Sequence, residues 1–180
     1  MPEFTHVIHT IPPTFDEQSR VLVLGSVPSP KSRESGYNYG HPQNRFWRVL
    51  ATLAGEQTPS SVEDKRAFCL RHHIALWDVV AECDIVGASD ASIRNVRANP
   101  LRDIVDAAPI EAIFCTGAKA HALYRKYCEA EVGMPATKLP STSPANAACS
   151  FERLLVAYGE IFRHVGERKG PTGEGSEDDA

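Results

Sequence analysis

The sequence predicts an α/β fold in which helices cover both faces of a parallel sheet. Val21–Leu24 is an uninterrupted apolar run that ends at Gly25, as expected of a strand buried on both faces. Further short apolar runs then alternate with segments of helical spacing along the chain. This alternation is typical of parallel strands joined by right-handed crossover helices.

The segment after this strand, Ser26–Gln43, is rich in Ser, Pro and Gly and is predicted to be one long loop. Loops of this length in a compact domain are usually functional or disordered, and we favour a functional loop here. A helix is predicted next, because apolar residues recur at helical spacing up to Gly55. These residues are Phe46, Trp47, Leu50 and Leu53.

Ser60–Glu63 has the spacing of a capping box and predicts a second helix that runs toward Arg71. Ile74–Trp77 is the second predicted strand, and the stretch after it is predicted to be a polar loop. Asn99 and Pro100 predict the start of a third helix, with Asn99 as its cap. The buried stripe of that helix is Leu101, Ile104, Val105 and Ala108.

Ile110–Cys115 is the third predicted strand, and Thr137–Leu139 is a short fourth strand. Between them, Gly117–Lys119 is predicted to turn into a helix that contains Ala122, Leu123 and Tyr127. Ser150 is predicted to cap the last helix. The apolar face of that helix is Phe151, Leu154, Leu155, Tyr158, Phe162 and Val165.

The 180 residues have the length of one domain, which we place at residues 1–166. Residues 167–180 hold five acidic and two basic side chains and are expected to form a disordered acidic tail. Most of the net charge of −4 therefore falls on this tail. Residues 31–48 carry four basic side chains against Glu34 alone, and such a cluster suffices for phosphate contact, although most such clusters are solvated faces. The basic residues are Lys31, Arg33, Arg45 and Arg48.

No stretch approaches the roughly 18 consecutive apolar residues of a membrane helix, and the first residues lack the pattern of a signal peptide. We therefore expect a cytoplasmic protein without a membrane partner, and we predict a monomer. The cysteines form no Cys-x-x-Cys pair and are expected to be reduced core residues, so neither a metal nor another cofactor is predicted. They are Cys69, Cys83, Cys115, Cys128 and Cys149.

Two loops at predicted strand ends combine hydroxyls, amides and backbone N–H groups near helix N-termini. The carboxyl ends of parallel strands are where ligand sites form, and this chemistry suits phosphate binding. The first loop contains Gly25–Ser29 and Tyr37–Trp47, and the second is Leu139–Asn146. Only the first contains aromatic side chains.

These two motifs resemble the uracil-DNA glycosylase superfamily, and their detailed sequence is most similar to its hypoxanthine-DNA glycosylase branch. The resemblance runs from about Val21 to Val165. It implies a three-layer α/β/α sandwich around a four-stranded parallel sheet. It also implies that DNA containing deaminated bases is the partner, and that a flipped base is released by hydrolysis of its N-glycosidic bond, leaving an abasic site.

The chain departs from related branches at Val27, where they carry an Asp or Asn that positions the attacking water. The resemblance makes Asn44 the candidate catalytic residue, as an amide that orients water and stabilises a cationic sugar. Tyr39 matches the position of an aromatic residue that stacks on the flipped base. The implied base-binding residues are Gly25, Ser26, Val27, Pro28, Tyr39, Gly40 and His41.

In the second loop, many relatives begin with a His and carry a Leu wedge, and the matching positions here are Leu139 and Ser143. Contact between the base and that His is therefore excluded in this chain. The late-loop residues that resemble a phosphate clamp are Ser141, Thr142, Ser143, Pro144 and Asn146.

Structural roles compete with these functional ones. Asn44 can cap the helix that follows it, and His41 can serve in turn packing. Asp78, Asp90 and Ser92 can line a pocket or serve as caps and turns. Lys119 is either a surface residue or a phosphate contact, and the surface role is ranked higher. Lys31, Lys119 and Lys138 leave a lyase activity open.

Three other functions compete with release of hypoxanthine. One is a glycosylase for uracil or mismatched bases, and another is a non-catalytic nucleic-acid-binding module, given Val27. The third is a small nucleotide hydrolase.

Overall fold

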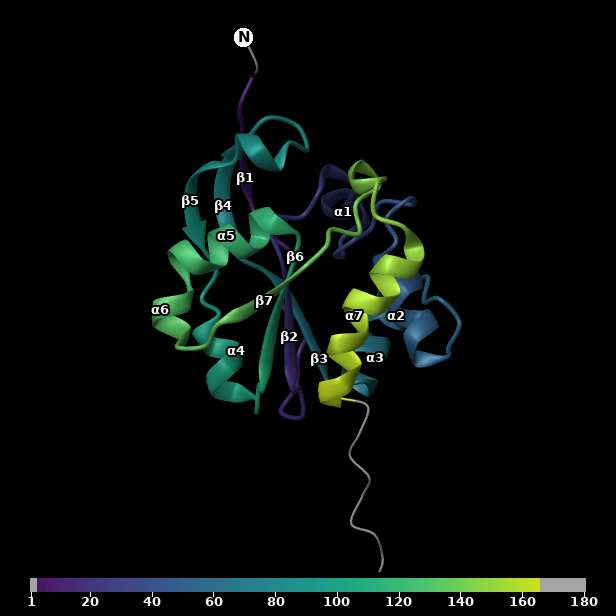
Figure 1. Ribbon diagram of the computed structural model, residues 1–180. Helices are drawn as coiled ribbons and strands as arrows, with labels where there is room; N and C mark the ends of the chain where they lie inside the picture. Colours follow the sequence, from purple (N-terminus) through teal and green to yellow (C-terminus); the bar gives the residue numbers. More distant parts are fainter. Residues whose placement is uncertain (1–2, 166–180) are drawn as a thin grey trace, which may run out of the picture.

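A four-stranded parallel sheet forms the centre of the computed structural model, which describes residues 3–165 (Figure 1). Its strand order is β3-β2-β6-β7. β2, the first predicted strand, pairs with a parallel neighbour on each side. The strands are β2 (Val21–Gly25), β3 (Ile74–Asp78), β6 (Ala112–Thr116) and β7 (Ala136–Leu139). The predicted parallel sheet is confirmed.

Helices cover both faces of this sheet, as Figure 1 shows. One layer contains α2 (Phe46–Ala54), α3 (Val62–Arg71) and α7 (Phe151–Val165). The other contains α4 (Arg102–Ala107), α5 (Ala118–Tyr127) and α6 (Glu129–Val132). The predicted three-layer sandwich is confirmed.

Alternate residues of β2 contribute to two separate hydrophobic cores. Val21 and Val23 pack in the core beneath α2, α3 and α7, with Phe46 and Tyr158. Leu22 and Leu24 pack in the core beneath α4 and α5. Because successive side chains of a strand point to opposite faces, both faces of β2 are buried, which explains its continuous apolar sequence.

A second sheet corrects the prediction of a polar loop after β3. This sheet is antiparallel, with the order β1-β4-β5. Its strands are β1 (Thr5–Ile8), β4 (Val80–Ile85) and β5 (Arg94–Ala98). Two register shifts between β4 and β5 interrupt the alternation of apolar and polar side chains, and charged pairs such as Arg97 with Glu82 hold the exposed face. The sequence therefore has the composition of a loop although it forms strands.

The predicted long loop Ser26–Gln43 also contains a helix, α1 (Pro30–Ser35). Ser29 caps it by accepting a hydrogen bond from the Ser32 N–H, and it ends at Gly36, whose φ of 82° lies in the left-handed region. Ser32 is its only buried residue. A helix without an apolar stripe has no periodic signal, which is why the prediction missed it.

Two predicted helix caps are located by the structure. The capping contact of α3 lies one residue later than predicted, because the Ser61 side chain accepts from the Asp64 N–H. The Ser150 cap of α7 is confirmed by a bond of 3.2 Å from the Arg153 N–H. Both contacts satisfy backbone donors that a first helical turn leaves free.

The predicted cap at Asn99 is wrong. Its side chain is buried and donates to the backbone carbonyls of Asp78 and Val80, while α4 begins at Arg102. Asn99 therefore connects β5 to the junction of β3 and β4.

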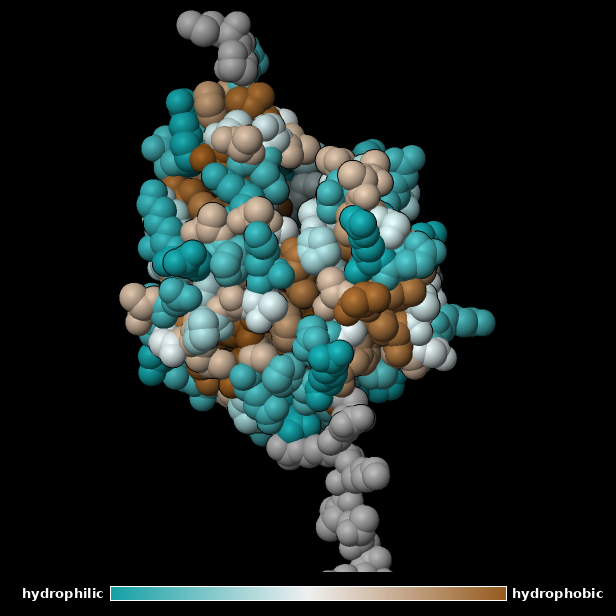
Figure 2. Space-filling view, in the orientation of Figure 1, coloured by the Kyte–Doolittle hydropathy of each residue, from teal (hydrophilic) through white to brown (hydrophobic). Residues whose placement is uncertain are grey.

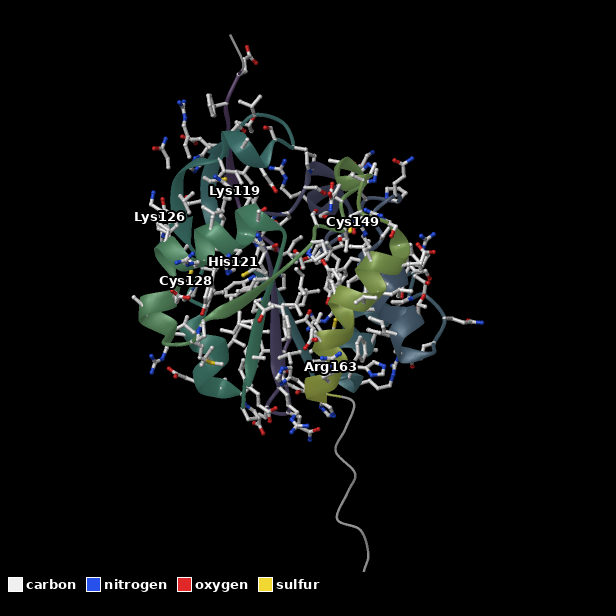
Figure 3. The ribbon with its side chains drawn as sticks, in the orientation of Figure 1. Lys119, His121, Lys126, Cys128, Cys149 and Arg163 are labelled. Carbon is white, nitrogen blue, oxygen red and sulfur yellow. The ribbon has the colours of Figure 1, made fainter. Side chains whose placement is uncertain are left out.

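All five cysteines are free, which confirms that they are reduced, and four of them are buried. Cys149 corrects the prediction of a core residue, since it is half-buried in the segment before α7, far from Cys128 (Figure 3).

No helix within residues 3–165 is long and apolar enough to cross a membrane. In the same range, no three His, Cys, Asp or Glu side chains converge as a metal site requires. The predicted tail and the domain boundary at residue 166 lie outside the described residues.

Candidate active site

A cavity of about 330 Å³ opens at the carboxyl ends of the parallel strands. Three strands place their last residues on its wall, namely Gly25 of β2, Asp78 of β3 and Thr116 of β6. The segment after β2, the end of β4 and the late loop at residues 141–145 complete the wall. Figure 2 shows the surface hollowed between the small antiparallel sheet and the late loop.

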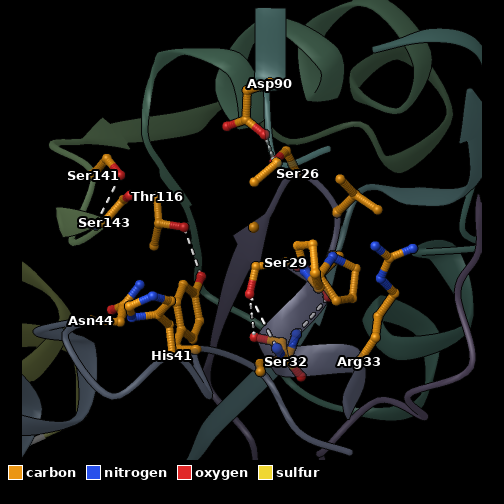
Figure 4. A pocket seen from close by; sticks show the side chains of 18 of the residues that line it. Ser26, Ser29, Ser32, Arg33, His41, Asn44, Asp90, Thr116, Ser141 and Ser143 are labelled. Carbon is orange, nitrogen blue, oxygen red and sulfur yellow. Dashed lines mark hydrogen bonds between the residues drawn. The ribbon is translucent and has the colours of Figure 1, made fainter. Parts of the chain in front are cut away.

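Eleven of the thirteen predicted site residues line this cavity. They are Gly25, Ser26, Val27, Pro28, Tyr39, His41, Asn44, Ser141, Thr142, Ser143 and Pro144 (Figure 4). The other two, Gly40 and Asn146, do not line it. The Gly40 N–H donates to Ser32 Oγ, and Asn146 Nδ2 donates to the Ser141 carbonyl. The fold thus brings the two predicted loops together on one cavity.

Asn44 connects these two loops. Its Oδ1 accepts one bond of 2.9 Å from the Phe46 N–H and another of 2.8 Å from the Thr142 hydroxyl. Asn44 therefore contacts the first turn of α2 and also lines the cavity. Within residues 3–165 its Nδ2 has no hydrogen-bond partner, so the fixed amide retains two N–H donors for a ligand or water.

Tyr39 lies beside Asn44 on the wall. Its ring stacks on Phe46 with centroids 3.8 Å apart, and its hydroxyl lies 2.6 Å from Thr116 Oγ1. Burial raises the pKa of Tyr39 well above 10, so the phenol stays neutral. Because Phe46 covers one face of the ring, only the opposite face or the edge can contact a planar ligand. The predictions that Phe46 and Trp47 are core residues are confirmed.

Val27 lines the cavity and packs against the core beneath α4 and α5. Its side chain has no hydrogen-bonding atom, so it cannot orient water. The neighbouring Ser26 hydroxyl donates to Asp90. Of the two amides that line the cavity, Asn38 donates to Asp78, whereas no partner is found for Nδ2 of Asn44 within residues 3–165.

Asp78 belongs to the cavity wall, a role that the sequence left open. Its side chain is only 4% exposed, and its Oδ2 accepts from His9 Nε2 at 2.7 Å and from Asn38 Nδ2 at 2.5 Å. Oδ1 has no hydrogen bond within residues 3–165 and lies so close to Gly25 that no side chain would fit there. A charged residue at the end of an apolar run is the signal that could have identified it, because buried charges are normally paired.

Asp90 also lines the cavity, whereas Ser92 accepts a bond from the Val86 N–H within the adjacent turn. Asp90 keeps part of its surface open to solvent, but partial burial of its carboxyl group raises its pKa. The Ser26 hydroxyl at 3.2 Å and the charge of Lys119 oppose that rise. Lys119 does not line the cavity; it lies at the start of α5 (Figure 3).

Three of the four cations of the predicted basic cluster are engaged within the protein. Lys31 pairs with Glu34, and the Arg48 guanidinium lies over the Phe151 ring. Arg45 donates to the backbone carbonyls of Cys149 and Asn146 in the late loop. Arg33 is the one that lines the cavity.

The late loop is held where it leaves β7. Leu139 is buried at the end of β7, and the Tyr158 hydroxyl of α7 donates to the Pro140 carbonyl at 2.7 Å. Thr142 is buried, while Ser141 and Ser143 are half-buried on the cavity wall. These contacts fix hydroxyls and backbone N–H groups at the rim.

The fold and cavity define a class of three-layer α/β proteins whose pocket can hold one planar group against an aromatic ring. Comparison with known proteins identifies the family within that class, since the model of the uracil DNA glycosylase superfamily matches residues 12–159. The chain belongs to the uracil DNA glycosylase superfamily. The resemblance inferred from the two motifs is confirmed.

Two similar curated proteins are named hypoxanthine DNA glycosylase. The one from Methanosarcina acetivorans is 30% identical over 154 residues, covering 85% of this chain and 96% of its own length. The one from Methanosarcina barkeri is 34% identical over 153 residues, covering 84% and 96%. A solution NMR structure of a Methanosarcina acetivorans protein assigned to the uracil DNA glycosylases is 30% identical, with a TM-score of 0.76 over 88% of this chain and 98% of that one.

Proposed function

We propose that the chain is a monofunctional DNA glycosylase that removes deaminated bases, hypoxanthine above all, and leaves an abasic site. Membership of the superfamily and the names of two similar proteins support this activity. The observation that carries the proposal is the Asn44 amide, which two loops hold beside Tyr39 on the cavity wall. A cavity of about 330 Å³ falls in the usual range for small-ligand pockets, roughly 300 to 1,000 Å³.

The geometry supports a reaction in which bond breaking precedes attack by water. The bond between the sugar carbon and the base nitrogen breaks, and its electron pair goes to the departing base. Asn44 cannot take a proton from water, because its Oδ1 already accepts two hydrogen bonds and an amide is a very weak base. Its Nδ2 donates to the oxygen of a water that adds to the cationic sugar and then loses a proton to solvent.

The free oxygen of Asp78 supports selection of deaminated bases. Deamination of adenine converts a ring nitrogen with a lone pair into an N–H donor, and the same change turns cytosine into uracil. A buried carboxylate oxygen accepts a hydrogen bond from that N–H but repels the lone pair of the undamaged base. We assign Asp78 Oδ1 to this contact, which favours hypoxanthine over adenine and uracil over cytosine.

The test is single-turnover cleavage of labelled duplexes that each carry one inosine, uracil or xanthine, with alkali added to cut abasic sites. We expect cleavage of the inosine strand, and we expect Asn44→Ala to reduce the rate about 100-fold or more, in the range for loss of one electrostatic contact to the transition state. Gln57→Ala removes an exposed amide outside this cavity and is the matched control. Unchanged turnover in Asn44→Ala would remove that residue from the mechanism.

Val27 favours a second candidate, a non-catalytic DNA-binding module. This function predicts salt-sensitive binding to all duplexes with no abasic product from any of them.

A further inference from the structure

We propose that Arg33 recognises the adjacent O6 and N7 atoms of a flipped purine and makes the site prefer hypoxanthine to uracil. This inference rests on the proposed glycosylase function and adds a specificity-determining residue to it. Arg33 lies in α1, the helix that the sequence did not predict.

Arg33 differs from the other cations of its segment in having no partner. Its side chain is half-buried on the cavity wall, and within residues 3–165 it makes no ion pair or hydrogen bond. Lys31, on the same helix, is paired with Glu34 and lies outside the cavity. No other Lys or Arg among the described residues lines the cavity. An unpaired guanidinium in such a place is available to a ligand.

The position of Arg33 favours contact with the base. Figure 4 shows Arg33 across the cavity from Asn44, Ser141 and Ser143. With Asn44 orienting the water, the reacting sugar carbon lies beside it, and the hydroxyls and N–H groups of the late loop are suited to its flanking phosphates. The part of the nucleotide that extends toward Arg33 is then the far edge of the base.

The chemistry of that edge matches a guanidinium. In hypoxanthine, as in guanine, O6 and N7 are neighbouring acceptors that an Arg contacts with two parallel N–H donors. Adenine presents an amino donor at the same place, and uracil has no N7. The positive charge also stabilises the negative charge that O6 and N7 acquire as the bond to the sugar breaks, so the contact strengthens in the transition state.

The first measurement is single-turnover release of hypoxanthine by Arg33→Gln, Arg33→Lys and the control Arg125→Gln, at an exposed arginine of α5 outside the cavity. We expect a loss of about 100-fold for Arg33→Gln, a smaller loss for Arg33→Lys and no change for Arg125→Gln, since Lys retains the charge but not the paired donors. Thermal unfolding of each variant verifies that it is folded. An unchanged rate in Arg33→Gln overturns the inference.

The second measurement separates base contact from phosphate contact. Wild type and Arg33→Gln are titrated with a duplex carrying 2′-fluoro-2′-deoxyinosine, which resists cleavage, and with a duplex carrying tetrahydrofuran, which has no base. We expect Arg33→Gln to lose affinity for the first duplex only. If Arg33→Gln loses equal affinity for both duplexes, and the slope of binding against salt falls by about the value for one phosphate contact, Arg33 does not contact the base and the inference is overturned. If wild type releases no hypoxanthine, the proposed function fails, and this comparison still decides what Arg33 contacts.

Discussion

Asp90 shows how one residue of the cavity combines opposing electrostatic effects. Partial burial raises its pKa, whereas the Ser26 hydroxyl and the charge of Lys119 lower it. The net result is a pKa above the ordinary value of 3.8. The folded protein then binds the Asp90 proton more tightly than the unfolded chain does. The resulting contribution to the free energy of unfolding is fully present at pH values below the pKa of Asp90 in the unfolded chain. It is lost as the pH rises through the folded pKa.

We predict that Ser26→Ala raises the pKa of Asp90 further, because it removes the hydrogen bond that stabilises the carboxylate. Carboxyl-carbon NMR titration of the two proteins measures the change directly. Ser89→Ala is the control, because Ser89 lies next to Asp90 in an exposed turn but outside the cavity. This variant should leave the pKa of Asp90 unchanged. A fall in the pKa of Asp90 in Ser26→Ala would contradict this account.

At the scale of elements, α7 positions the late loop. The Tyr158 ring is fully buried in the core, and its hydroxyl reaches the Pro140 carbonyl. We predict that Tyr158→Phe retains the core packing but costs about 1 kcal/mol of unfolding free energy, the usual net value of one hydrogen bond. It should also speed hydrogen exchange in the loop at residues 140–146 and weaken DNA binding.

Exchange measured by mass spectrometry and a urea titration test this prediction. Tyr127→Phe, at the end of α5 and partly exposed, removes a hydroxyl far from the loop and should change neither measurement. Protection of the loop that is equal in Tyr158→Phe and wild type would show that Arg45 and the other contacts suffice to hold it.

The elements differ in how far the sequence predicts them. β2 is predictable because burial on both faces leaves a continuous apolar run, and Gly25 with the residues after it is then placed at a strand end. β4 and β5 are not, because their register shifts and charged pairs hide the alternation. The charge of Asp78 at the end of β3 is visible in the sequence, but its contacts with His9 and Asn38, 69 and 40 residues earlier in the chain, leave no local pattern.

On the scale of the whole molecule, the net negative charge of the chain opposes binding to DNA, which is itself negatively charged. The chain carries a net charge of −4, and residues 167–180 contribute five acidic and two basic side chains to it. Among the cations of residues 31–48, Lys31 is paired with Glu34, whereas Arg45 and Arg48 contact uncharged groups and keep their charge. Negative charge anywhere on a small protein slows its association with a polyanion, most strongly at low salt.

We therefore predict that deletion of residues 167–180 strengthens binding to undamaged duplex DNA a few-fold at low salt and has little effect at high salt. The melting temperature should stay the same, because the deletion retains every residue of the two hydrophobic cores in the part of the chain that the structure describes. Fluorescence anisotropy across a salt series measures the effect. The control is the full-length chain with its five acidic residues from 167 onward changed to the corresponding amides, which should bind more tightly, as the deletion does. A gain in affinity for the deletion alone would mean that these residues act by occupying space and not through their charge.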